Sequence, residues 1–371
     1  MKILLLTSNT GEGHNQTSKA LIKEFEESGH KCVAVDSLEF LSAKHSRFLC
    51  GWHERLYKFL PKTASIGYSI IDKYPSCLEK KGKWLYNYFA KGAEKLNKTV
   101  LDGKYDLVIS VHPFSTVILA SMQEKFPETK IKTAFIPTDY TCSPGGASGD
   151  VDVYFIPHPD LTDDFVKRGV KKEKIFPVYG IPVGKNFYSP PSKKESKEKL
   201  GLRESSKAVL LTCGSMGCGP IYKLTKKLSK ALPIDTHLFV ICGKNRSLYK
   251  KLCKKTFSEN ISILGYINNM IDYVSASDVY ITKPGGISST EAAVLGVQTL
   301  LINAVGGCET YNFNFFVKKG SARTVKKLDG FVELTLKTLH GDKDFERACL
   351  KIKEEFSESS AKAIAKYYSK Q

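Results

Sequence analysis

The chain has 371 residues, of which 42% are hydrophobic, so it can bury more than one core and two domains are expected. Fifty-six lysines and arginines against 38 aspartates and glutamates give a net charge of +18, which favours a polyanionic partner such as nucleic acid or an anionic membrane face. The sequence holds no nucleic-acid recognition motif, no transmembrane-length apolar run, no signal-peptide pattern and, among its ten cysteines, no metal-ligand spacing; we therefore expect a cytoplasmic protein without metal, cofactor or nucleic acid.

Short apolar runs alternate with helical patterns through the first half of the chain. Strands are predicted at residues 2–8, 31–35, 107–111, 132–136 and 153–156, with helices at 16–28 and 116–125. This alternation is typical of a parallel, doubly wound α/β sheet.

Residues 41–101 interrupt the pattern, because they contain no strong strand. Apolar side chains at helical spacing, including Phe48 and Trp52, are interleaved with Arg55 and several lysines, which predicts a basic amphipathic helix. A second such stripe surrounds Trp84. Both stripes can pack into the N-terminal core; alternatively, they contact a bilayer or a lipid acceptor.

A proline-containing, highly charged stretch at 184–206 indicates an interdomain connection. The alternation then restarts, with strands predicted at 208–212, 237–242, 261–264, 279–282 and 299–302 and final helices at 345–356 and 359–369. We therefore expect two Rossmann-like domains, 1–185 and 186–356, in an α/β fold.

Glycine-rich turns follow three of the predicted strands. The first, at 9–14, ends in His14, which at a helix entrance is either structural or a general base. The others, at 212–219 and 282–292, place backbone N–H groups at helix starts, where they either form ordinary βα turns or hold a diphosphate. Glu291 in the last of these can accept hydrogen bonds from a ribose diol. Asp150 and Asp152 match a short acidic pattern of metal-dependent sugar transfer, but they lead directly into a strand, and we expect no metal there.

Taken together, these motifs resemble the monogalactosyldiacylglycerol synthases and the bacterial processive diacylglycerol glucosyltransferases, which are UDP-sugar transferases with the two-domain GT-B fold. The stretches that carry the resemblance occur in the expected order along nearly the whole chain: 8–14, 111–113, 137–139, 180–183, 242–245, 265–270, 282–286 with 291–292, and 307–309 with Asn312.

The resemblance implies a role for individual residues. His14 would activate the acceptor hydroxyl with help from Asp36, and the last helix would return to the N-terminal domain across a cleft between the domains. The donor UDP-sugar would be bound by Gly13, Gly214, Ser215, Gly243, Asn245, Gly265, Tyr266, Ile267, Met270, Lys283, Gly285, Gly286, Ile287, Ser288, Glu291, Glu309 and Asn312.

The sequence departs from the family pattern at three places. Glu12 replaces the middle of three glycines, Cys308 stands where glutamine is frequent, and Tyr140–Gly146 replaces a segment that usually holds a tryptophan. The expected activity is inverting transfer of a hexose from UDP-sugar to a lipid such as diacylglycerol, at the inner face of the cell membrane, where the chain would be bound peripherally. A UDP-sugar epimerase or hydrolase, or a non-catalytic UDP-sugar-binding membrane-associated protein, remains an alternative.

Overall fold

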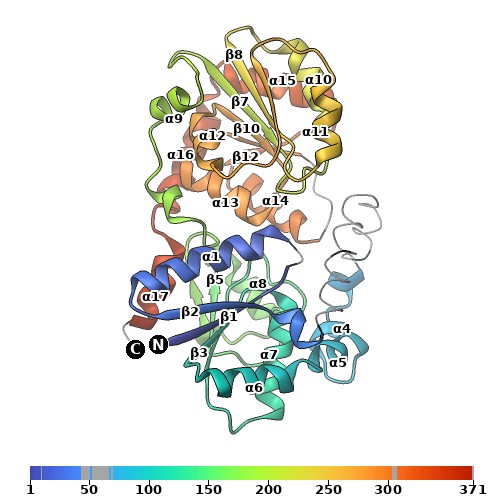
Figure 1. Ribbon diagram of the computed structural model, residues 1–371, viewed down its shortest axis with the longest axis vertical. Helices are drawn as coiled ribbons and strands as arrows, with labels where there is room; N and C mark the ends of the chain where they lie inside the picture. Colours follow the sequence, from blue (N-terminus) through green and yellow to red (C-terminus); the bar gives the residue numbers. More distant parts are fainter. Residues whose placement is uncertain (10, 43–50, 52–66, 68–69, 303–306, 370–371) are drawn as a thin grey trace. The chain divides into compact units, whose positions relative to one another are not determined.

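The structure is a computed structural model that describes residues 1–9, 11–42, 51, 67, 70–302 and 307–369. It divides into two compact units (Figure 1). The N-terminal unit comprises Met1–Gly184 with Glu358–Gln371, and the C-terminal unit comprises Lys185–Ala304 with Asn312–Ser357; a short stretch, Val305–Tyr311, is grouped with the N-terminal unit.

The N-terminal unit is built on a six-stranded parallel sheet in the order β2-β1-β3-β4-β5-β6. Its strands are β1 (Lys2–Thr7), β2 (Lys31–Asp36), β3 (Leu107–Ser110), β4 (Lys132–Phe135), β5 (Val153–Ile156) and β6 (Ile175–Pro177). Its helices are α1 (Glu12–Glu27), α4 (Ser76–Glu79), α5 (Trp84–Ala90), α6 (Ala93–Gly103), α7 (Pro113–Lys125), α8 (Thr162–Lys167) and α17 (Ser360–Ser369), with 3₁₀ turns η1 (Ser37–Phe40), η2 (Pro159–Leu161) and η3 (Lys172–Lys174).

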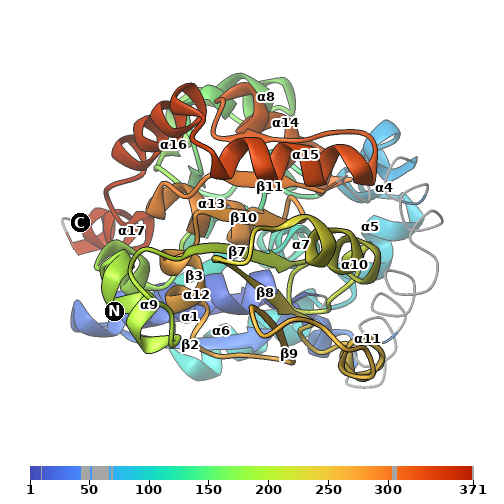
Figure 2. The same cartoon turned by 90° about the horizontal axis from the view of Figure 1, so that it is seen from above.

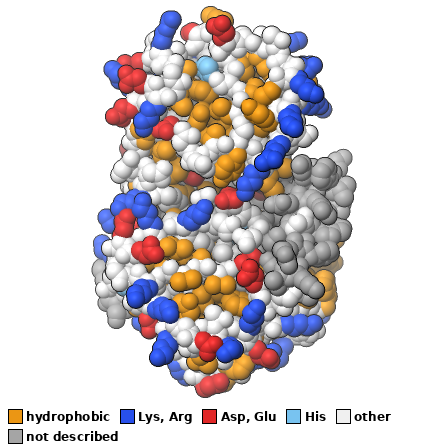
Figure 3. Space-filling model, in the orientation of Figure 1, with side chains coloured by type: hydrophobic (Ala, Val, Ile, Leu, Met, Phe, Trp, Pro, Cys, Tyr) orange, Lys and Arg blue, Asp and Glu red, His pale blue; other side chains and the backbone are white. Residues whose placement is uncertain are grey.

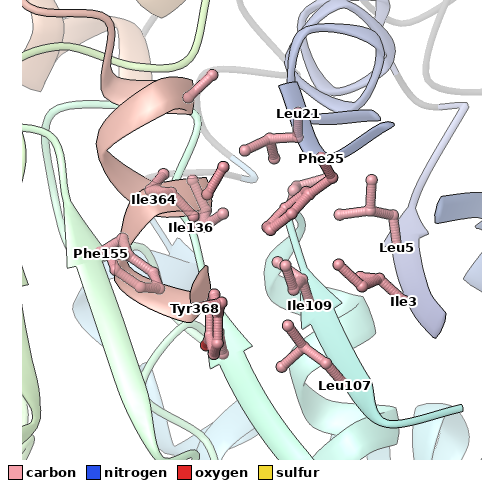
Figure 4. Close-up of a cluster of buried hydrophobic side chains, with 14 of the residues drawn as sticks. Ile3, Leu5, Leu21, Phe25, Leu107, Ile109, Ile136, Phe155, Ile364 and Tyr368 are labelled. Atoms are coloured by element: carbon pink, nitrogen blue, oxygen red, sulfur yellow. The ribbon is translucent and has the colours of Figure 1, made fainter. Parts of the chain in front are cut away.

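The core of this unit joins the two ends of the chain. Figure 4 shows Ile3 and Leu5 of β1 and Phe25 of α1 packed with Ile364 and Tyr368 of α17. The Phe25 and Tyr368 rings lie 6.3 Å apart. Since these side chains are almost fully buried, α17 forms part of the N-terminal core although it follows the whole C-terminal unit in sequence.

The C-terminal unit repeats the architecture with a parallel sheet in the order β12-β11-β10-β7-β8-β9. Its strands are β7 (Lys207–Thr212), β8 (Thr236–Ile241), β9 (Ile261–Leu264), β10 (Val279–Thr282), β11 (Thr299–Leu301) and β12 (Ala322–Arg323). Its helices are α9 (Lys193–Lys199), α10 (Ile221–Ala231), α11 (Arg246–Cys253), α12 (Met270–Ala276), α13 (Gly286–Leu295), α15 (Leu328–Leu339) and α16 (Lys343–Glu355), preceded by the 3₁₀ turn η4 (Lys185–Tyr188). Helix α14 (Cys308–Lys318) belongs to this unit from Asn312 onward. Helices α10, α11 and α15 cover one face of this sheet, and α12 and α13 cover the other (Figure 2).

The doubly wound α/β fold predicted from the sequence is confirmed, and the expected strands all form. Several elements were not predicted, among them two strands and helix α9. The edge strands β6 and β12 are very short, and α9 lies inside the expected connection. Helix α9 has a complete capping box, in which Ser192 and Glu195 exchange side-chain and backbone hydrogen bonds, so the sequence Ser-x-x-Glu was the available signal.

Each sheet reverses its winding direction at one pair of neighbouring strands. In the N-terminal sheet the reversal lies between β1 and β3, and in the C-terminal sheet it lies between β7 and β10. Ligands of open α/β sheets bind outside the carboxyl ends of the strands at this switch point. The loops that follow β1 and β3, and those that follow β7 and β10, are therefore the places to look for a site.

Candidate active site

His14 lies in the first turn of α1, immediately after β1, and is held by groups from the neighbouring strands. Its Nδ1 atom lies 3.1 Å from the carbonyl oxygen of Val111, after β3, and 2.9 Å from Oγ1 of Thr138, after β4. Because a carbonyl oxygen only accepts, the first contact fixes a proton on Nδ1. In the neutral ring Nε2 then holds the lone pair, which is the arrangement that a general base needs.

His112 extends this arrangement. It caps α7, because its Nδ1 accepts a hydrogen bond from the backbone N–H of Phe114 at 3.1 Å. Its ring lies edge-on to the ring of His14, with the two ring centres 4.5 Å apart. His112 and Thr138 were not among the predicted site residues. The signal that could have found them is their position, since His112 follows β3, which neighbours β1 in the sheet, and Thr138 follows β4, the next strand beyond β3.

Asp36 ends β2 and is buried. One of its carboxylate oxygens accepts the backbone N–H of Leu38 at 3.0 Å, which caps η1, and the other accepts the Asn9 amide at 2.9 Å. Asn9 in turn accepts a hydrogen bond from Asn15, next to His14. Asp36 therefore braces the loop that carries Gly13 and His14, and the carbonyl of Val111 and the hydroxyl of Thr138 orient the imidazole itself.

In the C-terminal unit, the loops after β7 and β8 pack backbone against backbone. The N–H of Lys244 donates to the Ser215 carbonyl at 2.7 Å. A Cβ atom on Gly243 would lie 2.2 Å from that same carbonyl oxygen, so only glycine allows the approach. Asn245 was predicted to bind the donor. Its side-chain amide makes two structural hydrogen bonds, because its oxygen caps α11 and its nitrogen donates to the Gly217 carbonyl at 3.0 Å.

Lys283 follows β10 and reaches across to the loop after β7. A Cβ atom on Gly214, where φ is +67°, would lie 2.7 Å from Lys283 Cε. The Lys283 side chain therefore lies against the first glycine turn, while Gly285 begins the N-terminus of α13 and is followed by Gly286, Ile287 and Ser288. An ammonium group and the N–H groups of a helix start thus occur together at the switch point, which is the composition of a phosphate site.

Glu291 lies in the second turn of α13 and is only partly exposed. Burial raises the pKa of its carboxyl to about 8. A carboxyl group with this pKa keeps its proton at neutral pH, and groups with such perturbed pKa values are concentrated at functional sites.

The loop between β9 and α12 holds the residues expected to bind a base. Tyr266 is exposed, with the Lys244 ammonium 5.6 Å from its ring centre, while Ile267 and Met270 are half-buried and pack against a core cluster. Gly265 has no atom within 4 Å of where a Cβ would be, so this position leaves room beside the backbone.

Two expected sugar-binding residues lie on α14. Glu309 is buried in its first turn. Asn312 is fully buried, and its amide donates to the Pro284 carbonyl at 3.1 Å. Asn312 therefore supports the turn that leads from Lys283 into α13.

Of the four residues predicted to contact a membrane, Phe48, Trp52 and Arg55 lie outside the described residues. Trp84 begins α5 and is 72% exposed, whereas Phe89 on the same helix is buried and stacks on Phe114 at 4.3 Å. The second amphipathic stripe is thus divided between a surface residue and the core. Within the described part of the chain, no helix is both long and apolar enough to span a bilayer.

The acidic pair at 150 and 152 has structural partners. Asp152 accepts both the backbone N–H and the hydroxyl of Thr133, and Asp150 pairs with Lys174 at 2.6 Å. Among the residues that the structure describes, no group of three or more His, Cys, Asp and Glu side chains is placed to hold a metal ion.

Comparison with known proteins matches both halves of the chain. Residues 14–183 match the family described as monogalactosyldiacylglycerol (MGDG) synthase, and residues 208–366 match the glycosyltransferase family 28 C-terminal domain. The chain is 28% identical to a processive diacylglycerol beta-glucosyltransferase of Bacillus pumilus, over 93% of this chain and 88% of that protein. It is 29% identical to a probable chloroplastic monogalactosyldiacylglycerol synthase of Nicotiana tabacum, over 88% of this chain and 62% of that protein. The Acinetobacter baumannii MurG structure has the same fold, with a TM-score of 0.66 at 13% identity over 100% of this chain and 99% of that one.

Proposed function

We propose that the chain is a glycosyltransferase of the monogalactosyldiacylglycerol synthase family and that it transfers a hexose from a UDP-sugar to the hydroxyl of a lipid such as diacylglycerol, with inversion at the anomeric carbon. The observation that carries the proposal is the pair of switch-point loops. One presents an oriented imidazole, and the other presents a lysine beside a helix N-terminus.

The C-terminal unit would bind the nucleotide. The diphosphate would lie against the N–H groups of Gly286–Ser288 and the ammonium of Lys283, and the ribose hydroxyls would bind Glu291. As the bond from the sugar to the diphosphate breaks, negative charge accumulates on the departing UDP. Preorganised N–H groups and an ammonium stabilise this charge, so we propose that the chain needs no metal.

The N-terminal unit would supply the base. Nε2 of His14 would take the proton of the lipid hydroxyl while its oxygen attacks the anomeric carbon from the face opposite UDP. The carbonyl of Val111 keeps Nδ1 as the proton-bearing nitrogen, and the hydroxyl of Thr138 contacts the same atom. A correctly oriented base of this kind contributes about 10²–10⁴-fold to a rate.

A membrane-facing surface on the N-terminal unit would bring the lipid to this base. Three large apolar side chains between residues 70 and 84 of this unit are strongly exposed: Ile70 at 55%, Tyr74 at 53% and Trp84 at 72%. They occur near Lys80, Lys81 and Lys83, which are exposed. Aromatic and basic residues together are typical of surfaces that lie in the headgroup region of a bilayer. We propose peripheral binding at the inner face of the cell membrane.

The experiment measures UDP release from several UDP-hexoses with and without vesicles that contain diacylglycerol. The proposal predicts release that requires the lipid, and a glycolipid product. His14→Ala should lower this rate at least a hundredfold while calorimetry still detects UDP binding. His340→Ala is a matched control, because His340 is exposed at the end of α15 and its Nδ1 contacts only the helix carbonyl of Leu336 among the contacts described.

Three outcomes separate the alternatives. UDP release that does not depend on lipid indicates a hydrolase or an epimerase. UDP binding without turnover indicates a UDP-sugar-binding protein. Loss of UDP affinity in His14→Ala with turnover preserved contradicts the role of His14 as base.

A further inference from the structure

The positive charge of the chain is concentrated in one short region of the C-terminal unit. Residues 221–255 contain nine lysines and one arginine but a single acidic residue, Asp235. Their net charge is therefore +9, half of the +18 of the whole chain, in 35 residues. A charge that served solubility alone would be spread over the surface with acidic residues among it.

The fold gathers this charge on one side of the unit. Helices α10 and α11 cover the same face of the C-terminal sheet, as the buried Leu224 and Leu252 show. The two helices touch through Lys251, whose ammonium lies 4.2 Å from the ring centre of Tyr222. We call this surface the α10–α11 face; its exposed basic residues are Lys223, Lys226, Lys230, Lys244, Arg246, Lys250, Lys251, Lys254 and Lys255.

Figure 3 shows Lys and Arg side chains gathered along the border of the C-terminal unit where Figure 1 places α11. One basic residue of the region, Lys227, pairs with Asp329 of α15. Helix α16 of the same unit gives the contrast, because its 13 residues carry four basic and four acidic side chains and no net charge. The charge of the α10–α11 face is thus a property of that face and not of the unit.

We propose that the α10–α11 face docks on an anionic phospholipid bilayer, as a membrane contact of the donor-binding unit. The choice of a bilayer as the partner rests on the proposed lipid acceptor. The inference that this face binds a polyanion rests on its charge and is independent of the proposed function. Two observations favour a bilayer over nucleic acid. The basic residues are lysines with one exception, and lysine is a point charge suited to a diffuse surface, whereas arginine is preferred for fixed phosphate contacts. Tyr222 and the exposed Tyr249 add amphipathic rings of the kind found at membrane interfaces.

The position of the face links docking to the proposed activity. It begins at Lys244, in the loop whose backbone packs against Ser215, and α11 follows directly. A bilayer bound to α11 would therefore lie beside the loops proposed to hold the UDP-sugar, close to where the lipid hydroxyl has to arrive.

The test compares two double variants of the full chain with equal charge change. Lys250→Gln/Lys254→Gln removes two exposed lysines of the face, and Lys343→Gln/Lys351→Gln removes two exposed lysines of α16. Partitioning is measured by co-sedimentation with vesicles of phosphatidylcholine alone and of phosphatidylcholine with phosphatidylglycerol. Each lysine beside an anionic surface contributes roughly a fivefold factor, so the first variant should bind the anionic vesicles about thirtyfold more weakly. The α16 variant should change by less than about twofold, because its charges lie off the face.

Calorimetry with UDP on the same proteins keeps this proposal separate from the proposed function. Equal vesicle affinity of the two variants overturns docking through the α10–α11 face. Loss of binding to a single-stranded RNA in the first variant, with its vesicle binding unchanged, also overturns it and assigns the face to nucleic acid. Selective loss of anionic-vesicle binding supports docking whether or not UDP binds; absence of UDP heat in the unsubstituted chain contradicts the proposed function alone.

Discussion

Glu291 gives the sharpest prediction, because its pKa of about 8 means that it carries a proton before the nucleotide binds. At pH 7 a group with that pKa is about 90% protonated. If ribose hydroxyls donate to its carboxylate, UDP binding requires loss of this proton. We therefore expect UDP binding at pH 7 to release close to one proton, roughly 0.9, from Glu291, and at pH 9 only about 0.1.

The assay is titration calorimetry with UDP in buffers of different ionisation enthalpy, in which the slope of observed heat against ionisation enthalpy gives the number of protons released. Glu291→Gln keeps the shape of the side chain but cannot release a proton, so the difference between the two proteins isolates this carboxyl from the phosphate of UDP. The same release in both proteins, or none in the unsubstituted chain, would refute the assignment of Glu291 to the ribose.

The raised pKa also determines how stability depends on pH. Between the usual pKa of a glutamate and about 8, the folded chain holds a proton that the unfolded chain has lost. Glu291 therefore contributes a fall in the free energy of unfolding of up to about 1.4 kcal/mol per pH unit as pH rises through this window. Denaturant unfolding at pH 5 and pH 8 should show a smaller fall in Glu291→Gln; an identical fall would contradict the burial argument.

Three further predictions concern the two switch-point loops and the metal. Gly214→Ala should lower the free energy of unfolding by about 1–3 kcal/mol, since φ is +67° at this position, and should weaken UDP binding in calorimetry, since the new Cβ would displace Lys283. An unchanged dissociation constant for UDP would contradict the placement of Lys283 at the diphosphate. Thr138→Val should lower kcat about tenfold with the UDP affinity intact, because it removes an orienting contact of His14. Thr138→Ser should restore kcat, and a kcat that the valine leaves unchanged would refute the role of Thr138 in positioning His14. Excess EDTA should leave the initial transfer rate within about twofold, because N–H groups and Lys283 are proposed to neutralise the diphosphate; a rate abolished by EDTA and restored by Mg²⁺ would overturn the metal-independent mechanism.

The pattern of apolar runs was sufficient to predict the two parallel sheets, because buried parallel strands are nearly continuous apolar segments. Val153–Ile156 and Val279–Thr282 are fully buried and were predicted at their observed bounds. Two edge strands escaped prediction for the opposite reason. β6 is three residues long and ends in Pro177, and β12 has two residues, so neither carries a periodic signal.

The site could be predicted in part. Glycines and charged residues placed after strands were visible in the sequence, and so His14, Lys283 and Glu291 were selected. Contacts between distant segments were not visible. Thr138 reaches His14 across 124 residues of sequence, and Phe89 is buried because Phe114 stacks on it. Asn245 was predicted to bind the donor, but the sequence did not indicate that its side-chain amide also caps α11 and donates to the carbonyl of Gly217 in the preceding glycine loop.

The central claim is that one chain binds a UDP-sugar in its C-terminal unit and passes the hexose to a lipid through His14. The most direct test supplies UDP-hexose labelled in the sugar to the purified chain with diacylglycerol vesicles and follows the label. The account predicts label in a chloroform-soluble glycolipid, with His14→Ala at least a hundredfold slower. Label that is released as free sugar, or that remains in UDP-hexose under every lipid condition, would contradict it.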